Sequence, residues 1–181
     1  SGSPVNYVVT VRPKPDVTAA NQAICSGQST SIAITNPNAV AGTTFTWIIQ
    51  SNTNVNGAVG GSGSTIMQVL SSADAVNTGT VVYRITPEAN GCPGDPYDVT
   101  VTVTPVPVIT NNASDFSKQI CSDETLNFLP TSTIGGTTYS WTSTISGPVS
   151  AGSITAAGSG TITDRPVNTG TVDGTVTYRI T

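Results

Sequence analysis

Two nearly identical octapeptides, GTVVYRIT at residues 79–86 and GTVTYRIT at residues 174–181, reveal an internal repeat in this 181-residue chain. Two more pairs of segments match at nearly the same spacing, namely ICS at 24–26 and 120–122, and TTFTW at 43–47 with TTYSW at 137–141. Self-similarity at one long period is the signature of tandem modules. The chain is therefore expected to contain two copies of one structural unit.

The phase of the repeats follows from a fourth match, between YVVTVRPKP at residues 7–15 and VTVTVTPVP at residues 99–107. We expect residues 1–14 to form the last strand of a preceding repeat. Residues 15–106 would then be one complete repeat, and residues 107–181 a second repeat that lacks its last strand. On this interpretation the chain is a section of a longer tandem array.

Apolar and polar residues alternate along the predicted strands. In YDVTVTV, residues 97–103, Tyr97 and three valines alternate with Asp98 and two threonines, which is the period of a sheet with one wet face. Turn-rich segments separate such runs, and we find no long helical period. About seven short strands per repeat predict an all-β protein of tandem immunoglobulin-like β-sandwiches. The aromatic residues expected in the two cores are Trp47, Tyr83, Trp141 and Tyr178.

Closely spaced prolines occur where the last strand of one repeat passes into the next repeat. Pro105 and Pro107 occupy this position, and Pro13 and Pro15 occupy it one repeat earlier. Prolines this close together favour extended polyproline geometry, which stiffens a linker. Successive repeats are therefore expected to stand in line as a semi-rigid rod.

Three cysteines raise the question of disulfide pairing. Cys25 precedes the second predicted strand and Cys92 lies in the loop before the last one, and a sandwich can bring such loops to the same end. We expect a Cys25–Cys92 bridge, worth about 4 kcal/mol in the chain-entropy model, which implies an oxidising compartment. Two free thiols are the alternative. Cys121 is the counterpart of Cys25, and we expect it to be unpaired by truncation, because its partner would fall beyond residue 181.

Charge and residue types exclude several functions. The chain has six basic residues and a net charge of −4, so it offers no electrostatic surface for nucleic acid. It has no histidine, and the usual serine and cysteine triads therefore lack their base. No apolar run approaches the roughly 20 residues that span a bilayer. We expect no enzymatic activity, no cofactor, no nucleic-acid partner and no membrane insertion of this segment.

Carboxylates are densest near the end of the first repeat, at Glu88, Asp95 and Asp98, and Asp16 could join them. A calcium ion between repeats is one interpretation, because calcium prefers oxygen ligands. A charged turn is the other, and we expect no metal site. The usual Asp-x-Asp-x-Asp-Gly calcium loop is absent, and the chain has no C-x-x-C spacing for zinc.

Several of these motifs together resemble a known family. They are the cysteine before the second strand, the Thr-x-Trp strand, GTVVYRITP at residues 79–87, the loop NGCPGDP at residues 90–96 and the closing VTVTP at residues 101–105. The pattern is similar to the PKD-like repeats of very large Bacteroidota surface adhesins, above all the SprB-type gliding-motility adhesins. The usual PKD signature Trp-Asp-Phe-Gly-Asp-Gly is missing, since Trp47 leads into Ile-Ile-Gln and Trp141 into Thr-Ser-Thr.

The resemblance implies a tandem PKD-like sandwich with an intramodule disulfide, exported by the type IX secretion system to the cell surface. It implies a structural and adhesive role as the stalk of a surface filament, in attachment and gliding motility, beside neighbouring repeats of the same chain. A surface polysaccharide is a candidate ligand. The alternative function is a carbohydrate-binding accessory module of a secreted multidomain enzyme, which exposed aromatic residues in line would favour.

The phase of the repeats also predicts self-association. Residues 5–12 would be a last strand without its own sandwich, and the second repeat would be a sandwich without its last strand. Strand addition from one molecule to the next satisfies both open edges. We therefore expect head-to-tail association through residues 5–12.

Overall fold

The computed structural model describes residues 2–181, and the chain divides into two compact units. Unit 1 comprises residues 1–106 and unit 2 comprises residues 107–181. The regular elements of the described residues are β-strands and two short 3-10 helices, which confirms the all-β class. Within residues 2–181, none of the helices has the length and apolar character that a membrane crossing requires.

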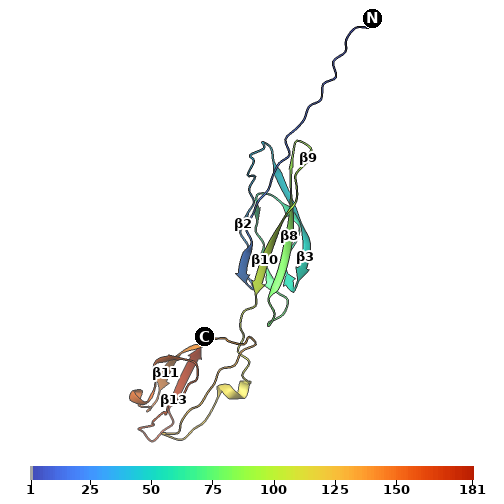
Figure 1. Cartoon of the computed structure of the whole chain (residues 1–181). Coiled ribbons are helices and arrows are strands. Elements are labelled where there is room, and N and C mark those ends of the chain that lie inside the picture. The colour runs from blue at the N-terminus through green and yellow to red at the C-terminus, as the bar shows by residue number, and fades with distance from the viewer. Residues whose placement is uncertain (1) are drawn as a thin grey trace. The chain divides into compact units, whose positions relative to one another are not determined.

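The larger sheet of unit 1 has six strands (Figure 1). Their spatial order is β1 (Gln22–Cys25), β10 (Tyr97–Thr104), β8 (Gly79–Ala89), β3 (Thr44–Thr53) and β5 (Gly61–Ser62), with β9 (Cys92–Pro93) paired to β8. Two short pairs form the opposite layer: β2 (Ile32–Ala33) with β6 (Thr65–Ile66), and β4 (Val55–Asn56) with β7 (Ser71–Ser72). Residues of both layers share one hydrophobic core, as in a β-sandwich.

The core of unit 1 follows from the alternation along its strands. The fully buried side chains of β8 and β10 include Val81, Tyr83, Ile85, Val99, Val101 and Val103. From the opposite layer, Ile66 and Leu70 are also fully buried. Each buried aliphatic side chain contributes about 1.5–3 kcal/mol relative to exposure, so these two strands carry much of the stability of the unit.

The first and last strands of unit 1 run in the same direction. β1 pairs with β10 in parallel, whereas β10 with β8 and β8 with β3 are antiparallel. Both β1 and β10 end at one pole of the unit, where Cys25 lies opposite Thr104 and the buried Pro105 follows. We call this the C-terminal pole. The opposite N-terminal pole contains β9 and receives residues 12–15 (Figure 1).

Unit 2 has one three-stranded sheet with the order β12 (Ala157–Ser159), β11 (Ser140–Ser146) and β13 (Thr175–Ile180). Its 3-10 helices are η1 (Ala113–Phe116) and η2 (Ala151–Ser153). By the sequence repeat, β11 corresponds to β3 and β13 to β8. Isolated bridges such as Phe128 to Ile162 connect the remaining chain, and Trp141 and Ile162 are buried.

Candidate functional site

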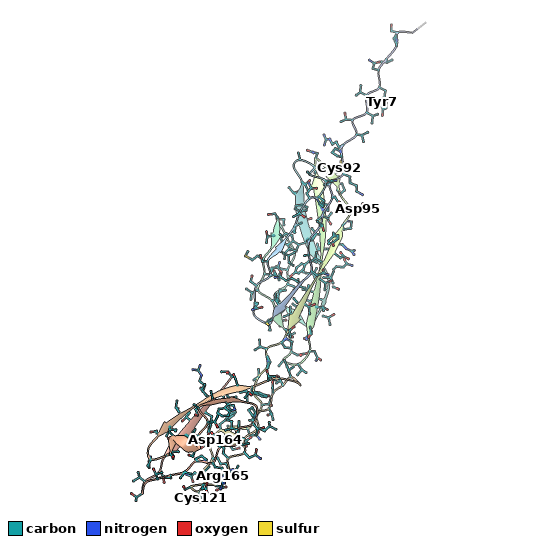
Figure 2. The ribbon with its side chains drawn as sticks, turned by 60° about the vertical axis from the view of Figure 1, so that its left-hand side comes forward. Tyr7, Cys92, Asp95, Cys121, Asp164 and Arg165 are labelled. Carbon is teal, nitrogen blue, oxygen red and sulfur yellow. The ribbon has the colours of Figure 1, made fainter. Side chains whose placement is uncertain are left out.

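The predicted Cys25–Cys92 disulfide is absent, and all three cysteines are free thiols. Cys25 lies at the C-terminal pole of unit 1. It pairs with Thr104, and the preceding residue, Val103, lies opposite Gly79, which is the first residue of β8. Cys92, which is labelled in Figure 2, pairs with Ala89, the last residue of β8. At about 3.3 Å per residue, the length of β8 separates the two cysteines by roughly 30 Å.

A disulfide requires its Cα atoms to lie within about 7 Å, so the expected bridge is wrong for this fold. The expected bridge requires that the segments containing Cys25 and Cys92 lie at the same end of the sandwich. The parallel pairing of β1 with β10 places them at opposite poles instead. Cys121 is exposed in unit 2, and it is a free thiol as well.

Residues 12–14, which lead into unit 1, form hydrogen bonds with its N-terminal pole. The Arg12 guanidinium donates to the carbonyl of Asn90, and Lys14 Nζ lies 2.5 Å from Asp95 Oδ1. The carbonyl of Lys14 also accepts a 2.9 Å hydrogen bond from Asn38 Nδ2. These contacts anchor residues 12–14 against the residues on both sides of β9 and against the loop that contains Asn38.

Cations hold two of the carboxylates considered for calcium. Arg84 donates to both oxygens of Asp98, over 2.8 and 2.7 Å, and Asp95 pairs with Lys14. The hydrogen bond from Arg84 lowers the pKa of Asp98 below its ordinary value. Within residues 2–181, no group of three His, Cys, Asp or Glu side chains is arranged to hold a metal ion. Two of the four carboxylates are therefore engaged in ion pairs with side chains of unit 1.

A tryptophan lies over a glycine in each unit. Trp47 is opposite Gly61 in the β3–β5 pair, and Trp141 is opposite Gly158 in the β11–β12 pair. A Cβ atom on Gly61 would lie 2.7 Å from Cζ2 of Trp47, and one on Gly158 would lie 2.5 Å from Cζ2 of Trp141. The two tryptophans could be predicted from the sequence, but the glycines could not, because their role depends on cross-strand register.

A tyrosine is hydrogen bonded at the same place in each unit. In unit 1, Tyr83 Oη donates to Gln68 Oε1 over 2.8 Å, and the Gln68 amide bonds both backbone groups of Val59. In unit 2, Tyr178 donates to Asp164 over 2.7 Å, and the Asp164 carboxylate accepts from Thr155. Each network fastens a loop to the sheet. The shared network is not visible in the sequence, because Gln68 of unit 1 is replaced by Asp164 in unit 2.

Burial raises the pKa of Tyr83 to about 12. Burial first, and then the hydrogen bond to Asp164, raise the pKa of Tyr178 above its ordinary value. Unlike the fully buried Tyr83, Tyr178 is partly exposed, although its ring packs edge-on against Trp141 with a centroid distance of 5.5 Å.

Alkaline pH is expected to destabilise unit 1 through Tyr83. Its folded-state pKa lies above the unfolded value of about 10, so its contribution is complete below pH 10 and is lost as the pH rises towards 12. The loss should be about 1 kcal/mol per pH unit. Urea unfolding at pH 9, 10 and 11, read by hydrogen exchange of β8 peptides, measures it. Tyr83→Phe should lack this decline, and an equal decline in the variant would contradict the assignment.

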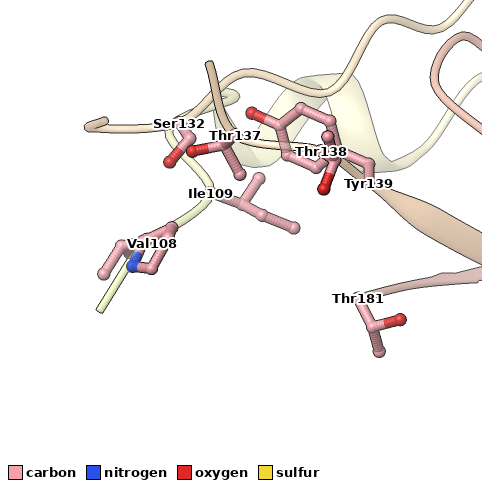
Figure 3. Close-up of a pocket in the computed structure, with 8 residues that line it drawn as sticks. Val108, Ile109, Ser132, Thr137, Thr138, Tyr139 and Thr181 are labelled. Carbon is pink, nitrogen blue, oxygen red and sulfur yellow. The ribbon is translucent and has the colours of Figure 1, made fainter. Parts of the chain in front are cut away.

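Unit 2 contains a shallow pocket of about 230 Å³ next to Thr181 (Figure 3). Its lining includes Thr138 and Tyr139, whose counterparts in unit 1 pair with Glu88 and Pro87 at the end of β8. The pocket is therefore the surface that the end of β8 covers in unit 1. This correspondence explains the hollow without a small-molecule ligand.

Few aromatic side chains are exposed in either unit. Among the described residues, the large exposed aromatics are Tyr7 in the N-terminal segment, Tyr97 in β10 and Phe116 in η1. Phe116 also packs against Phe128, with a centroid distance of 5.9 Å. These residues come from three different parts of the chain: the N-terminal segment, β10 and η1.

The fold is of the immunoglobulin-like β-sandwich type. Its side-chain hydrogen-bond networks connect loops to the sheets. The sequence model of the PKD-like domain family matches residues 22–107 and 118–181. The chain belongs to this family. PKD-like domains are typically extracellular. No curated protein sequence matches the chain.

Proposed function

We propose that this chain is a section of the stalk of a filamentous bacterial cell-surface adhesin, and that it transmits force during surface attachment and gliding. It is not an enzyme, and its partners include neighbouring repeats of the same protein. Family membership supports an extracellular structural or adhesive module. The observation that carries the mechanical part of the proposal is the parallel pairing of β1 with β10.

Because its first and last strands, β1 and β10, are parallel, unit 1 resists unfolding when tension is applied to its two ends. The chain enters at the N-terminal pole before β1 and leaves at the C-terminal pole after β10. Tension on the two ends therefore pulls β1 and β10 in opposite directions along their common axis. The register pairs Gln22–Cys25 with Val101–Thr104, so these backbone hydrogen bonds are loaded together rather than one after another.

Further hydrogen bonds extend this contact beyond both ends of β1. The Thr100 amide donates to Asn21 Oδ1 over 2.8 Å, and the Ser26 amide donates to the carbonyl of Thr104 over 2.8 Å. Ile24 and Val103 face each other across the pair and are buried, which keeps water from the rungs between them. Such a pair suits a module that must stay folded while force passes through it.

Single-molecule pulling in two directions tests the mechanical role. In the first geometry the handles are attached to the two termini, and β1 slides against β10. In the second, one handle is attached to Cys25 and the other to the C-terminus, with Cys92→Ser and Cys121→Ser leaving one thiol. Cys25 and Thr104 are neighbours at the C-terminal pole, so this pull separates the strands rung by rung.

We expect unit 1 to unfold at a several-fold higher force when it is pulled through its termini. The length released on unfolding distinguishes unit 1 from unit 2. The double cysteine variant, pulled through its termini, is the matched control and should keep the high force. Equal forces in both geometries would show that the β1–β10 pair does not bear the load. That result would overturn the proposal that this chain transmits force.

A further inference from the structure

The chain that leads into unit 1 contacts both layers of the sandwich in turn. Thr18 forms an isolated antiparallel bridge with Thr35, in which the amide of each residue donates to the carbonyl of the other over 3.0 Å. Thr35 comes just after β2, so this bridge belongs to the layer opposite the large sheet. Gln22 then begins β1 and pairs with Val101 in the large sheet. Between residues 18 and 22 the chain therefore passes from one layer to the other.

We call residues 12–18 the entry segment. The Asn38 side chain holds its backbone on both sides of a proline: Nδ2 donates to the carbonyl of Lys14 over 2.9 Å, and Oδ1 accepts from the amide of Asp16 over 3.1 Å. Val17 is 4% exposed and is part of the hydrophobic core. The entry segment therefore has contacts of its own, which are separate from the hydrogen bonds between β1 and β10.

Unit 2 has the same attachment. The amide of Thr110 donates to the carbonyl of Thr131 over 2.9 Å, and the Thr110 hydroxyl donates to the Thr131 hydroxyl over 2.9 Å. The isolated bridge next to this contact is antiparallel as well. By the repeat, Thr110 corresponds to Thr18 and Thr131 to Thr35. Antiparallel pairing of the incoming chain with this layer is therefore a property of the repeated module, and not of one position in the chain.

Tension applied on the N-terminal side of unit 1 reaches the entry segment before it reaches β1. A single bridge holds the entry segment to its layer, whereas β1 pairs with β10 over the whole range Gln22–Cys25. The Lys14–Asp95 ion pair is exposed, and exposed ion pairs contribute little to stability. The load therefore meets a weaker attachment first, and it passes to the β1–β10 pair once that attachment has broken.

We propose that the entry segment is a release element. Under rising tension it detaches from unit 1 at a low force, while the β1–β10 pair and the rest of the sandwich stay folded, and it docks again when the force falls. Val17 is its one member of the hydrophobic core, so release leaves the rest of the core assembled. The use of such an element in a stalk, a short reversible extension before any module unfolds, rests on the proposed function. The order of release is a property of unit 1 and does not rest on it.

Two matched core truncations test the order of release when the chain is pulled through its termini. Val17→Ala and Ile24→Ala each shorten a buried aliphatic side chain of the same core, one in the entry segment and one in β1. At constant force, Ile24→Ala should raise the unfolding rate of unit 1 about 10-fold or more, because Ile24 lies opposite Val103 in the pair that ruptures. Val17→Ala should change that rate less than about twofold, because the Val17 contacts are already lost in the released state.

Urea unfolding, read by hydrogen exchange of β8 peptides, provides the control. Both variants should weaken unit 1 in the absence of force, because both side chains are buried in the docked state. An equal rise of the unfolding rate in Val17→Ala and Ile24→Ala would show that the entry segment stays docked until the β1–β10 pair ruptures, and would overturn the proposal. A Val17→Ala chain as stable as the unaltered one would overturn it as well, since the entry segment would then not be docked in the core.

Amide exchange of the unaltered chain, followed by NMR in low urea, tests the released state without force or substitution. The amides of Thr18 and Thr35 should exchange faster than those of β10, with rates that depend little on urea, because detachment of a short segment exposes little surface. If these two amides instead exchange as slowly as those of β10 and with the same urea dependence, the entry segment opens only when unit 1 unfolds, and the inference is wrong. Equal unfolding forces in the two pulling directions would count against the stalk function, and not against this order of release.

Discussion

Trp47→Ala is expected to reduce the free energy of unfolding of unit 1 by about 3–5 kcal/mol, the usual cost of truncating a large buried aromatic side chain. Trp47 is 7% exposed and lies between β5 and β8 in the sheet, opposite both Gly61 and Ile85. Because glycine has no side chain, nothing at Gly61 can move in to fill the space of the indole. The cavity should therefore remain largely open.

The measurement is hydrogen exchange of β3, β8 and β10 peptides in increasing urea, which reports unit 1 separately from unit 2. Ile48→Ala is the matched control on the same strand, because Ile48 is 59% exposed, and its effect should stay within about 0.5 kcal/mol. Trp47→Phe should cost less than alanine. It keeps a ring and removes an indole Nε1 that is buried without a hydrogen-bond partner among the described residues. Equal losses for Trp47→Ala and Ile48→Ala would contradict the core role.

Gly79→Ala is expected to reduce the free energy of unfolding of unit 1 by about 3 kcal/mol, at the upper end of the usual cost of overpacking. A Cβ atom on Gly79 would lie 2.3 Å from the carbonyl oxygen of Asn54 and 2.7 Å from Cγ2 of Val55. The Asn54 carbonyl cannot withdraw easily, because it accepts a hydrogen bond from the amide of Ala73.

Gly135→Ala is the control, since a Cβ atom there would meet nothing within 4 Å. That change should leave stability unaltered or raise it slightly, because alanine restricts the unfolded chain. Both variants can be measured by the same exchange experiment, with peptides of unit 2 for Gly135→Ala. A loss below about 0.5 kcal/mol for Gly79→Ala would mean that the turn at Asn54 yields, contrary to its hydrogen bonding.

Local alternation explains how much of the fold could be predicted from the sequence. Side chains of a strand point to opposite faces in turn, so a period of two identifies both the strand and its buried face. The valines of residues 97–103 are buried in this way. The division into units by the repeat is likewise a property of the sequence, and the family match covers both copies.

The candidate sites could not be predicted to the same extent, because they depend on strand direction and register. The sequence does not show that β1 runs parallel to β10, and this direction separates Cys25 from Cys92. Register also decides that Trp47 faces Gly61 and that Gln68 meets Tyr83. Each of these contacts joins residues from different strands or loops.

The sequence by itself determined the class of the fold, the repeat and the residues that avoid water, because hydrophobic burial acts on each short segment through its own alternation. Only the tertiary structure decided which ends of the strands meet, which residues face each other across a pair of strands and which thiols can approach each other. Those outcomes follow from the order and direction of strands in a sheet, and hydrogen bonds between distant backbone segments set them. In this protein, strand direction places Cys25 and Cys92 at opposite poles of unit 1, so the predicted disulfide does not form.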